Sequence, residues 1–103
     1  MSGKIILVKT GSACPEQYDA FFDGVQVGYL RMRHGCFTVE HPNAGELLIL
    51  EDESPEGDGQ FTDEERGKFL NMACLAIYSV LLGEGKIADD FYVIGERPQY
   101  AGR

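Results

Sequence analysis

The sequence lacks the signatures of several protein classes. It has no run of 18 apolar residues, which a membrane-spanning helix would need. Its N-terminal segment holds only four consecutive aliphatic residues, too few for the core of a secretory signal peptide. Its three cysteines, Cys14, Cys36 and Cys74, are an odd number and lie far apart in the chain. We therefore expect no disulfide framework and a location in a reducing cytoplasm.

Motifs of catalytic and phosphate-binding sites are also missing. The glycine-bearing loops at 11–12 and 83–86 do not follow the G-x-x-x-x-G-K-[ST] spacing of a phosphate loop. The sequence contains no nucleophile elbow, no H-E-x-x-H helix motif and no C-x-x-C pair. We therefore predict that the protein is not an enzyme, that it has no cofactor, and that no residue is a catalytic residue or a metal ligand.

The chain has the size and composition of one globular domain. It contains 103 residues, of which 44% are hydrophobic and 25% charged. A chain of this length can bury roughly two-thirds of its unfolded surface, enough for one modest core. We predict a single domain over residues 1–103, with a frayed tail at 96–103 that carries a proline and several polar residues.

Turn signals recur at hairpin spacing and predict an antiparallel meander. Asp23-Gly24 and His34-Gly35 are typical of two-residue hairpin turns, which need positive φ angles. Strands are predicted over residues 4–10, 17–23, 25–33, 36–41 and 46–51, with a further strand at 91–94.

A long helix is predicted after the strands, from about Asp63 to Leu82. Thr62 is the expected N-cap, Glu65 completes a capping box, and Gly83 takes the C-cap position. The predicted fold class is therefore α+β, with a five- or six-stranded, mostly antiparallel sheet and one long helix packed on it.

Hydrophobic periodicity predicts which side chains form the core. The predicted core comprises Ile5, Leu7, Phe22, Leu30, Phe37, Val39, Leu48, Leu50, Phe69, Leu70, Ala73, Ile77 and Leu81. The helix has a second apolar stripe, formed by Met72, Leu75, Tyr78 and Leu82. We expect that stripe to be covered, either by the C-terminal segment or by a second copy of the chain, and we favour the C-terminal segment and hence a monomer over a homodimer.

The charge of the chain is concentrated in one segment. No basic residue occurs between Glu51 and Glu65, and the acids there carry a formal charge of −8, which equals the net charge of the whole chain. A patch of one sign attracts cations and basic surfaces. The predicted partner-binding residues are Glu51, Asp52, Glu53, Glu56, Asp58, Asp63, Glu64 and Glu65.

Three interpretations of this segment remain open. It can be a solvated loop, a protein interface that imitates the phosphate rail of a nucleic acid, or a calcium site. The calcium interpretation rests on EF-hand-like spacing of Asp52, Ser54, Glu56, Gln60 and Asp63. A pI near 4.6 argues against direct binding of nucleic acid or of an anionic membrane.

The segment DGVQVGYLRMRHG, residues 23–35, resembles the central hairpin of N-acetyltransferases of the GNAT type. In that family the hairpin precedes a coenzyme A site, whose pyrophosphate motif opens a helix. Here the helix opens with Thr62 and three acids, which would repel a phosphate. We therefore interpret the resemblance as a similarity of the hairpin sequence and not of the activity. The alternative function is a small ligand-binding domain or acyltransferase-like remnant that uses Arg31, Arg33, His34 and Cys36.

Taken whole, the small acidic chain resembles the single-domain inhibitors carried by phages and mobile elements, including anti-CRISPR proteins that act on Cas9. This resemblance implies a non-catalytic inhibitor in the cytoplasm of a bacterial host cell. Its implied partner is a basic effector nuclease of the Cas9 class, whose nucleic-acid loading or recognition it would block through the acidic surface.

Overall fold

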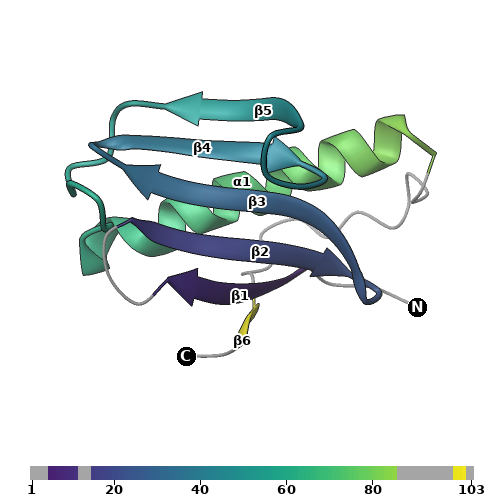
Figure 1. Cartoon of the computed structure of the whole chain (residues 1–103), viewed down its shortest axis with the longest axis horizontal. Helices are drawn as coiled ribbons and strands as arrows, with labels where there is room; N and C mark the ends of the chain where they lie inside the picture. The colour runs from purple at the N-terminus through teal and green to yellow at the C-terminus, as the bar shows by residue number, and fades with distance from the viewer. Residues whose placement is uncertain (1–4, 12–14, 86–98, 102–103) are drawn as a thin grey trace.

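The computed structural model describes residues 5–11, 15–85 and 99–101 (Figure 1). In chain order the elements are β1 (Ile5–Gly11), β2 (Glu16–Phe22), β3 (Val25–Arg33), β4 (Cys36–His41), β5 (Leu47–Asp52), α1 (Asp63–Gly83) and β6 (Gln99–Ala101). The expected strand at 91–94 lies outside the described residues.

The six strands form one sheet in the order β5-β4-β3-β2-β1-β6. Strands β1 to β5 are a continuous antiparallel meander, and α1 lies across one face of it (Figure 1). The predicted α+β class and the antiparallel meander are confirmed. Strand β6 lies within the segment for which the sequence predicted a frayed tail, where it pairs in parallel with β1 through Ile6 and Gln99.

The two predicted hairpin turns have the expected backbone conformation. Asp23 and Gly24 have φ angles of 52° and 81°, and His34 and Gly35 have φ angles of 53° and 74°. Positive φ at both central residues matches the twist of the flanking strands, which is why turns of this type join β2 to β3 and β3 to β4.

Helix α1 begins as predicted and ends slightly later. The Thr62 side chain accepts a hydrogen bond from the Glu65 N–H, and the Glu65 carboxylate accepts one from the Thr62 N–H, so the capping box is present. Gly83 is still helical, Glu84 is the C-cap, and Gly85 has a φ of 77°. The predicted C-cap at Gly83 is therefore wrong, because the left-handed residue that ends the helix is the next glycine.

The core lies between the sheet and α1. The buried core residues are Ile5, Leu7, Tyr18, Ala20, Val27, Leu30, Met32, Phe37, Val39, Phe61, Phe69, Leu70, Ala73, Cys74, Ile77, Tyr78 and Leu81. Phe22 and Leu50 pack against this cluster. Leu48, which the sequence placed in the core, is 47% exposed. A β-bulge interrupts the β4–β5 register there and changes which residues of β5 face inward.

Gly28, in β3, lies close to the Ile77 side chain of α1. A Cβ atom on Gly28 would lie 2.6 Å from Cδ1 of Ile77, a fully buried side chain. A side chain at position 28 would therefore force the Ile77 side chain or the helix to move, which favours glycine here.

The second apolar stripe of α1 is largely covered. Tyr78 is buried and meets Phe22 edge-on, with ring centroids 6.5 Å apart, and Met72 packs on the core. Leu75 and Leu82 are half-buried. In the described part of the chain, no helix has the length and apolarity needed to span a membrane.

Candidate functional site

The acidic patch, defined as the eight acids from Glu51 to Glu65, runs over three consecutive parts of the fold. It starts at the end of β5, continues through the loop at 53–62, and finishes in the first turn of α1. Two of its members, Asp52 and Glu65, are partly covered, and the other six are exposed.

Glu65 holds the loop in place and is not a free surface charge. Its carboxylate accepts hydrogen bonds from the N–H groups of Glu56 at 2.8 Å, Gly57 at 3.0 Å and Thr62 at 2.9 Å. Burial acts to raise the pKa of Glu65, but these backbone donors outweigh it, and the pKa lies below its ordinary value. Glu65 therefore stays ionised and fixes the loop against the start of the helix.

Asp52 and Asp63 also have partners within the protein. Asp52 accepts hydrogen bonds from the Ser54 hydroxyl at 2.5 Å and the Ser54 N–H at 2.8 Å, and these lower its pKa. Asp63 forms an ion pair with Arg66 at 2.7 Å. These two aspartates occupy the first and last positions of the EF-hand-like sequence spacing. Because both are already engaged, and because a strand precedes the loop, the geometry does not support an EF-hand site.

Three acids of the patch have side chains that meet no partner within the described residues. Glu53, Glu56 and Glu64 are exposed, and their carboxylates form neither a hydrogen bond nor an ion pair there. Glu56 and Glu64 line a surface hollow of about 490 Å³ next to Lys68. These three carboxylates are therefore the part of the patch that is available to a partner.

A buried ion pair fastens the base of the acidic loop to the sheet. Glu16, in β2, is 1% exposed and accepts hydrogen bonds from Arg66 Nε at 2.8 Å and from the Phe61 N–H at 2.9 Å. The Tyr18 hydroxyl donates to the same carboxylate. Burial raises the pKa of Glu16, but the hydrogen bonds from Arg66, Tyr18 and Phe61 outweigh it and lower the pKa overall.

Sequence reasoning missed Glu16. The signal that could have found it is the alternation Glu16, Tyr18, Ala20, which places the glutamate on the core face of its strand. Its partner Arg66 donates further hydrogen bonds to Asp63 and to the Phe61 carbonyl. Glu16, Phe61 and Arg66 together hold the end of the loop where α1 begins.

Gly57 determines the shape of the loop. A Cβ atom there would lie 1.7 Å from the carbonyl oxygen of Gln60, a backbone atom that cannot turn aside. We expect Gly57→Ala to open the loop and to lower the free energy of unfolding by about 1–3 kcal/mol. Hydrogen exchange should show faster exchange of two of the three amides that bind Glu65, those of residues 56 and 57.

Gly83→Ala is the matched control for the Gly57 variant. A Cβ atom on Gly83 would meet nothing within 4 Å, and the residue is helical. This variant should therefore be neutral or slightly stabilising, because alanine favours the helix more than glycine does. Equal behaviour of the two variants would contradict the assignment of Gly57 as the residue that shapes the loop.

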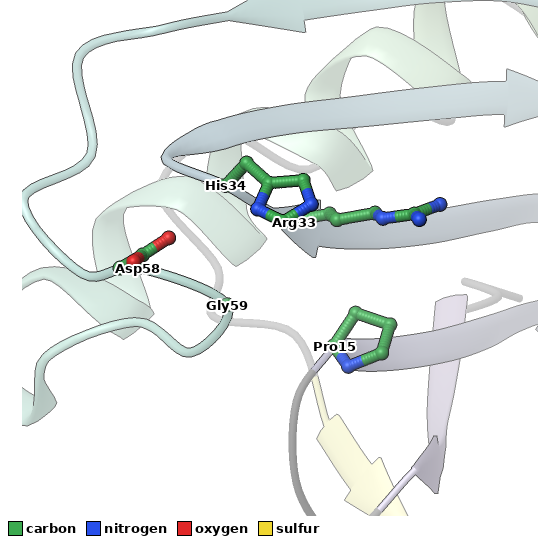
Figure 2. Close-up of a pocket in the computed structure, with 5 residues that line it drawn as sticks. All are labelled: Pro15, Arg33, His34, Asp58 and Gly59. Carbon is green, nitrogen blue, oxygen red and sulfur yellow. The ribbon is translucent and has the colours of Figure 1, made fainter.

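The hairpin residues of the alternative function are only partly brought together. Arg33 and His34 line a hollow of about 350 Å³ with Pro15, Asp58 and Gly59. Figure 2 shows the guanidinium of Arg33 extending away from His34 and Asp58. Arg31 and Cys36 are not among these lining residues, so only two of the four residues expected to form a ligand pocket share one hollow.

Cys36 is not set up as a nucleophile. Burial and the nearby carboxylates of Glu51, Glu53 and Asp52 raise the pKa of its thiol, which disfavours the reactive thiolate. The sulfur lies 4.0 Å from a Glu51 carboxylate oxygen, and with Glu53 these ligand atoms all lie within 4.8 Å of one another. Three such ligands, two of them exposed glutamates, are one fewer than a structural zinc site uses.

Cys74 is a buried core residue. Burial raises the pKa of its thiol to about 12, so it is an inert part of the helix packing.

Comparison with known proteins identifies no relative: no protein-family model matches the chain, and neither the curated proteins nor the solved structures contain a significant match.

Proposed function

We propose that this protein is a non-catalytic inhibitor that binds a basic protein through its acidic patch. The partner that fits this surface is a groove lined by lysine and arginine, such as the nucleic-acid channel of a Cas9-type nuclease. Occupying such a channel would block the loading or recognition of nucleic acid, as anti-CRISPR inhibitors do. The observation that carries the proposal is the set of three exposed carboxylates, Glu53 and Glu56 on the loop and Glu64 in the first turn of α1, that form no hydrogen bond or ion pair within the described residues.

The fixed shape of the loop supports a role in recognition. Glu65 binds three backbone N–H groups of the segment, and Phe61 is buried against Phe37, with ring centroids 5.0 Å apart. A pre-ordered loop loses little conformational entropy when a partner binds. Carboxylates on such a loop can therefore match the positions of basic side chains and not merely attract them.

We expect the triple variant Glu53→Gln, Glu56→Gln, Glu64→Gln to bind a Cas9-type nuclease more slowly. At low ionic strength the association rate constant should fall by roughly tenfold, because these charges steer the encounter. The difference from the wild type should shrink as salt is added, since salt screens exposed charges. Stopped-flow or surface-based kinetics over a salt series measure both effects.

The matched control is Asp19→Asn, Asp23→Asn, Glu84→Gln, which removes the same number of charges at residues that neither belong to the patch nor pair with β5 and keeps the acceptor oxygens that contact Gln26 and His41. The control should keep most of the association rate and the salt dependence, and both variants should keep the melting temperature. If the two triple variants slow association equally, net charge alone is responsible, and the patch is not the binding surface. If the wild type neither binds nor inhibits the nuclease, this partner is excluded.

A further inference from the structure

Strand β5 is an edge of the sheet that carries exposed apolar side chains. Within the described residues it pairs with β4 alone, and Figure 1 shows it at the upper edge of the sheet. Leu47 is 63% exposed and Leu48 is 47% exposed. Edge strands present unpaired N–H and C=O groups, and natural proteins rarely combine that edge with exposed leucines.

The bulge in β5 explains why Leu48 is exposed. The register shifts between Val39 and Glu40 of β4, which pair with Leu50 and Leu48, and leaves Ile49 as the extra residue. Ile49 and Leu50 both pack against the core, although adjacent strand residues normally point to opposite faces. Ile49 and Leu50 therefore fill this part of the core, and Leu48 faces the opposite side of the sheet. Leu47, which pairs with His41 at the start of the strand, is exposed as well.

Acids flank the exposed leucines at both ends of the strand. Glu46 precedes Leu47, and Glu51 and Glu53 follow, all of them exposed. Leu48 pairs with Glu40, and Glu51 pairs with Thr38, both on the face of β4 opposite the buried Val39. The open side of the edge thus offers an apolar centre between negative charges.

This charge pattern argues against a second copy of the chain as the occupant. In an antiparallel pairing centred on Ile49, Glu46 would lie opposite Asp52. In a pairing centred on Leu48, Glu46 would lie opposite Leu50, next to the position opposite Glu51, so the acids of the two copies again lie near one another. Like charges placed opposite each other destabilise a strand pair, and each copy also carries a net charge of −8. A strand with basic residues would instead be attracted to the acids at both ends of β5.

We infer that the edge of β5 takes up an extended segment of a partner protein by strand addition. The segment has an aliphatic residue that meets Leu48 and lysine or arginine residues on both sides of it that meet Glu46 and Glu51. Backbone hydrogen bonds to the β5 edge supply much of the affinity, and the flanking charges select a basic segment. This inference rests on the proposed binding of a basic partner and specifies how one part of that partner binds.

The test uses two synthetic ten-residue peptides in which lysine and leucine alternate with threonine. One has a normal backbone, and the other is N-methylated throughout its central peptide bonds, which keeps its charge and side chains but removes its donors. We expect the normal peptide to bind the intact protein and the methylated one to bind at least roughly tenfold more weakly, measured by fluorescence anisotropy. The amides of β5 should exchange with solvent more slowly when the normal peptide is bound.

Leu48→Lys should weaken binding of the normal peptide by roughly tenfold, because a lysine on the edge repels the basic strand and removes the apolar contact. Val25→Lys is the matched control: Val25 is 66% exposed and sits at the β2–β3 turn, so the net charge changes equally at a distance from β5. The control should bind almost as the wild type does. Equal weakening in both variants would overturn the assignment to β5.

The remaining outcomes separate this inference from the proposed function. Equal, salt-sensitive binding of both peptides overturns strand addition but leaves the acidic surface as a binding site for basic proteins. Binding of neither peptide overturns strand addition, and the nuclease kinetics then decide the proposed function independently. If sedimentation shows a dimer that Leu48→Lys dissociates, the edge binds a second copy of the chain. If the β5 amides exchange slowly in the free monomer, the edge is covered by another segment of the same chain. Either result overturns the inference.

Discussion

Replacing Glu16 by alanine should lower the free energy of unfolding by about 3–5 kcal/mol, the usual cost of breaking a buried ion pair. The change leaves the Phe61 N–H without its acceptor and removes one of the two carboxylates that Arg66 binds, the other being Asp63. Because the Arg66 side chain is 26% exposed and can turn towards water, we expect a value near the lower end of that range. Urea denaturation followed by circular dichroism measures the loss.

The double variant Glu16→Met, Arg66→Met is the control for this interpretation. Removing both charges leaves no buried charge without a partner, and buried ion pairs can often be replaced by apolar residues at little cost. The double variant should therefore be more stable than the sum of the two single variants predicts. Strict additivity would show that Glu16 and Arg66 act independently.

The contribution of Glu16 to the free energy of unfolding should also decrease as the pH falls. The folded-state pKa of Glu16 lies below its ordinary value of 4.5, so the ionised form is the one that the fold stabilises. The contribution is complete above pH 4.5 and is lost as the pH falls through the lowered folded-state pKa. The stability gap between the wild type and Glu16→Gln should accordingly narrow in acid, and a gap that widens would contradict the assignment.

Ile77→Ala should lower the free energy of unfolding by about 2–5 kcal/mol, the range for removing a large buried aliphatic side chain. Ile77 is fully buried at the centre of the contact between α1 and the sheet. A loss of this size is a large part of the total stability of a domain of 103 residues. Thermal and urea denaturation should agree on it, and a loss under 1 kcal/mol would mean that the site collapses around the smaller residue.

Gly28 provides a control for the packing at this position. Gly28→Ala alone should destabilise the protein, because its new Cβ would lie 2.6 Å from Ile77 Cδ1. In the Ile77→Ala background that atom is absent, so the same change should cost much less and can even fill part of the cavity. A double-mutant cycle measures this coupling, and simple additivity would contradict the close contact.

Much of the fold was predictable because its signals are local. The turns at Asp23-Gly24 and His34-Gly35 require residues that accept positive φ, and the Thr62 and Glu65 capping box is a pattern of adjacent positions. Strand boundaries for β3 and β4 follow directly from those turns. The α+β class, with a meander and one helix, could therefore be inferred from short stretches of sequence.

Apart from the C-cap of α1, which lies one residue later than predicted, the errors in the fold prediction concern contacts between distant residues. The bulge at Ile49 shifts one strand against its neighbour, and this is why Leu48 is exposed although its sequence context is apolar. Strand β6 pairs in parallel with β1, which is far away in the sequence, and no local sequence pattern predicts this pairing. Phe61 lies in a glycine-rich acidic loop, yet it completes an aromatic cluster with Phe37 and Phe69.

The sequence predicted where the acidic patch lies but not how its members differ. All eight acids look alike as a charge run, whereas the structure divides them by their hydrogen bonds. Glu65 binds backbone donors, Asp63 pairs with Arg66, and Asp52 binds Ser54. This division depends on the path of the loop, which Gly57 and the buried Glu16 determine together.

That division has an evolutionary consequence. Substitutions at Glu53, Glu56 and Glu64 break no hydrogen bond or ion pair of these side chains within the described residues, so we expect the chain to tolerate changes at these three positions with little loss of stability. Changes at Glu65 or Glu16 would instead damage the loop itself. A protein arranged in this way can adjust its surface rapidly when a target changes, because the residues that we propose to meet the target are not the residues that hold the loop. Stability and specificity can then be selected separately within one segment of fifteen residues.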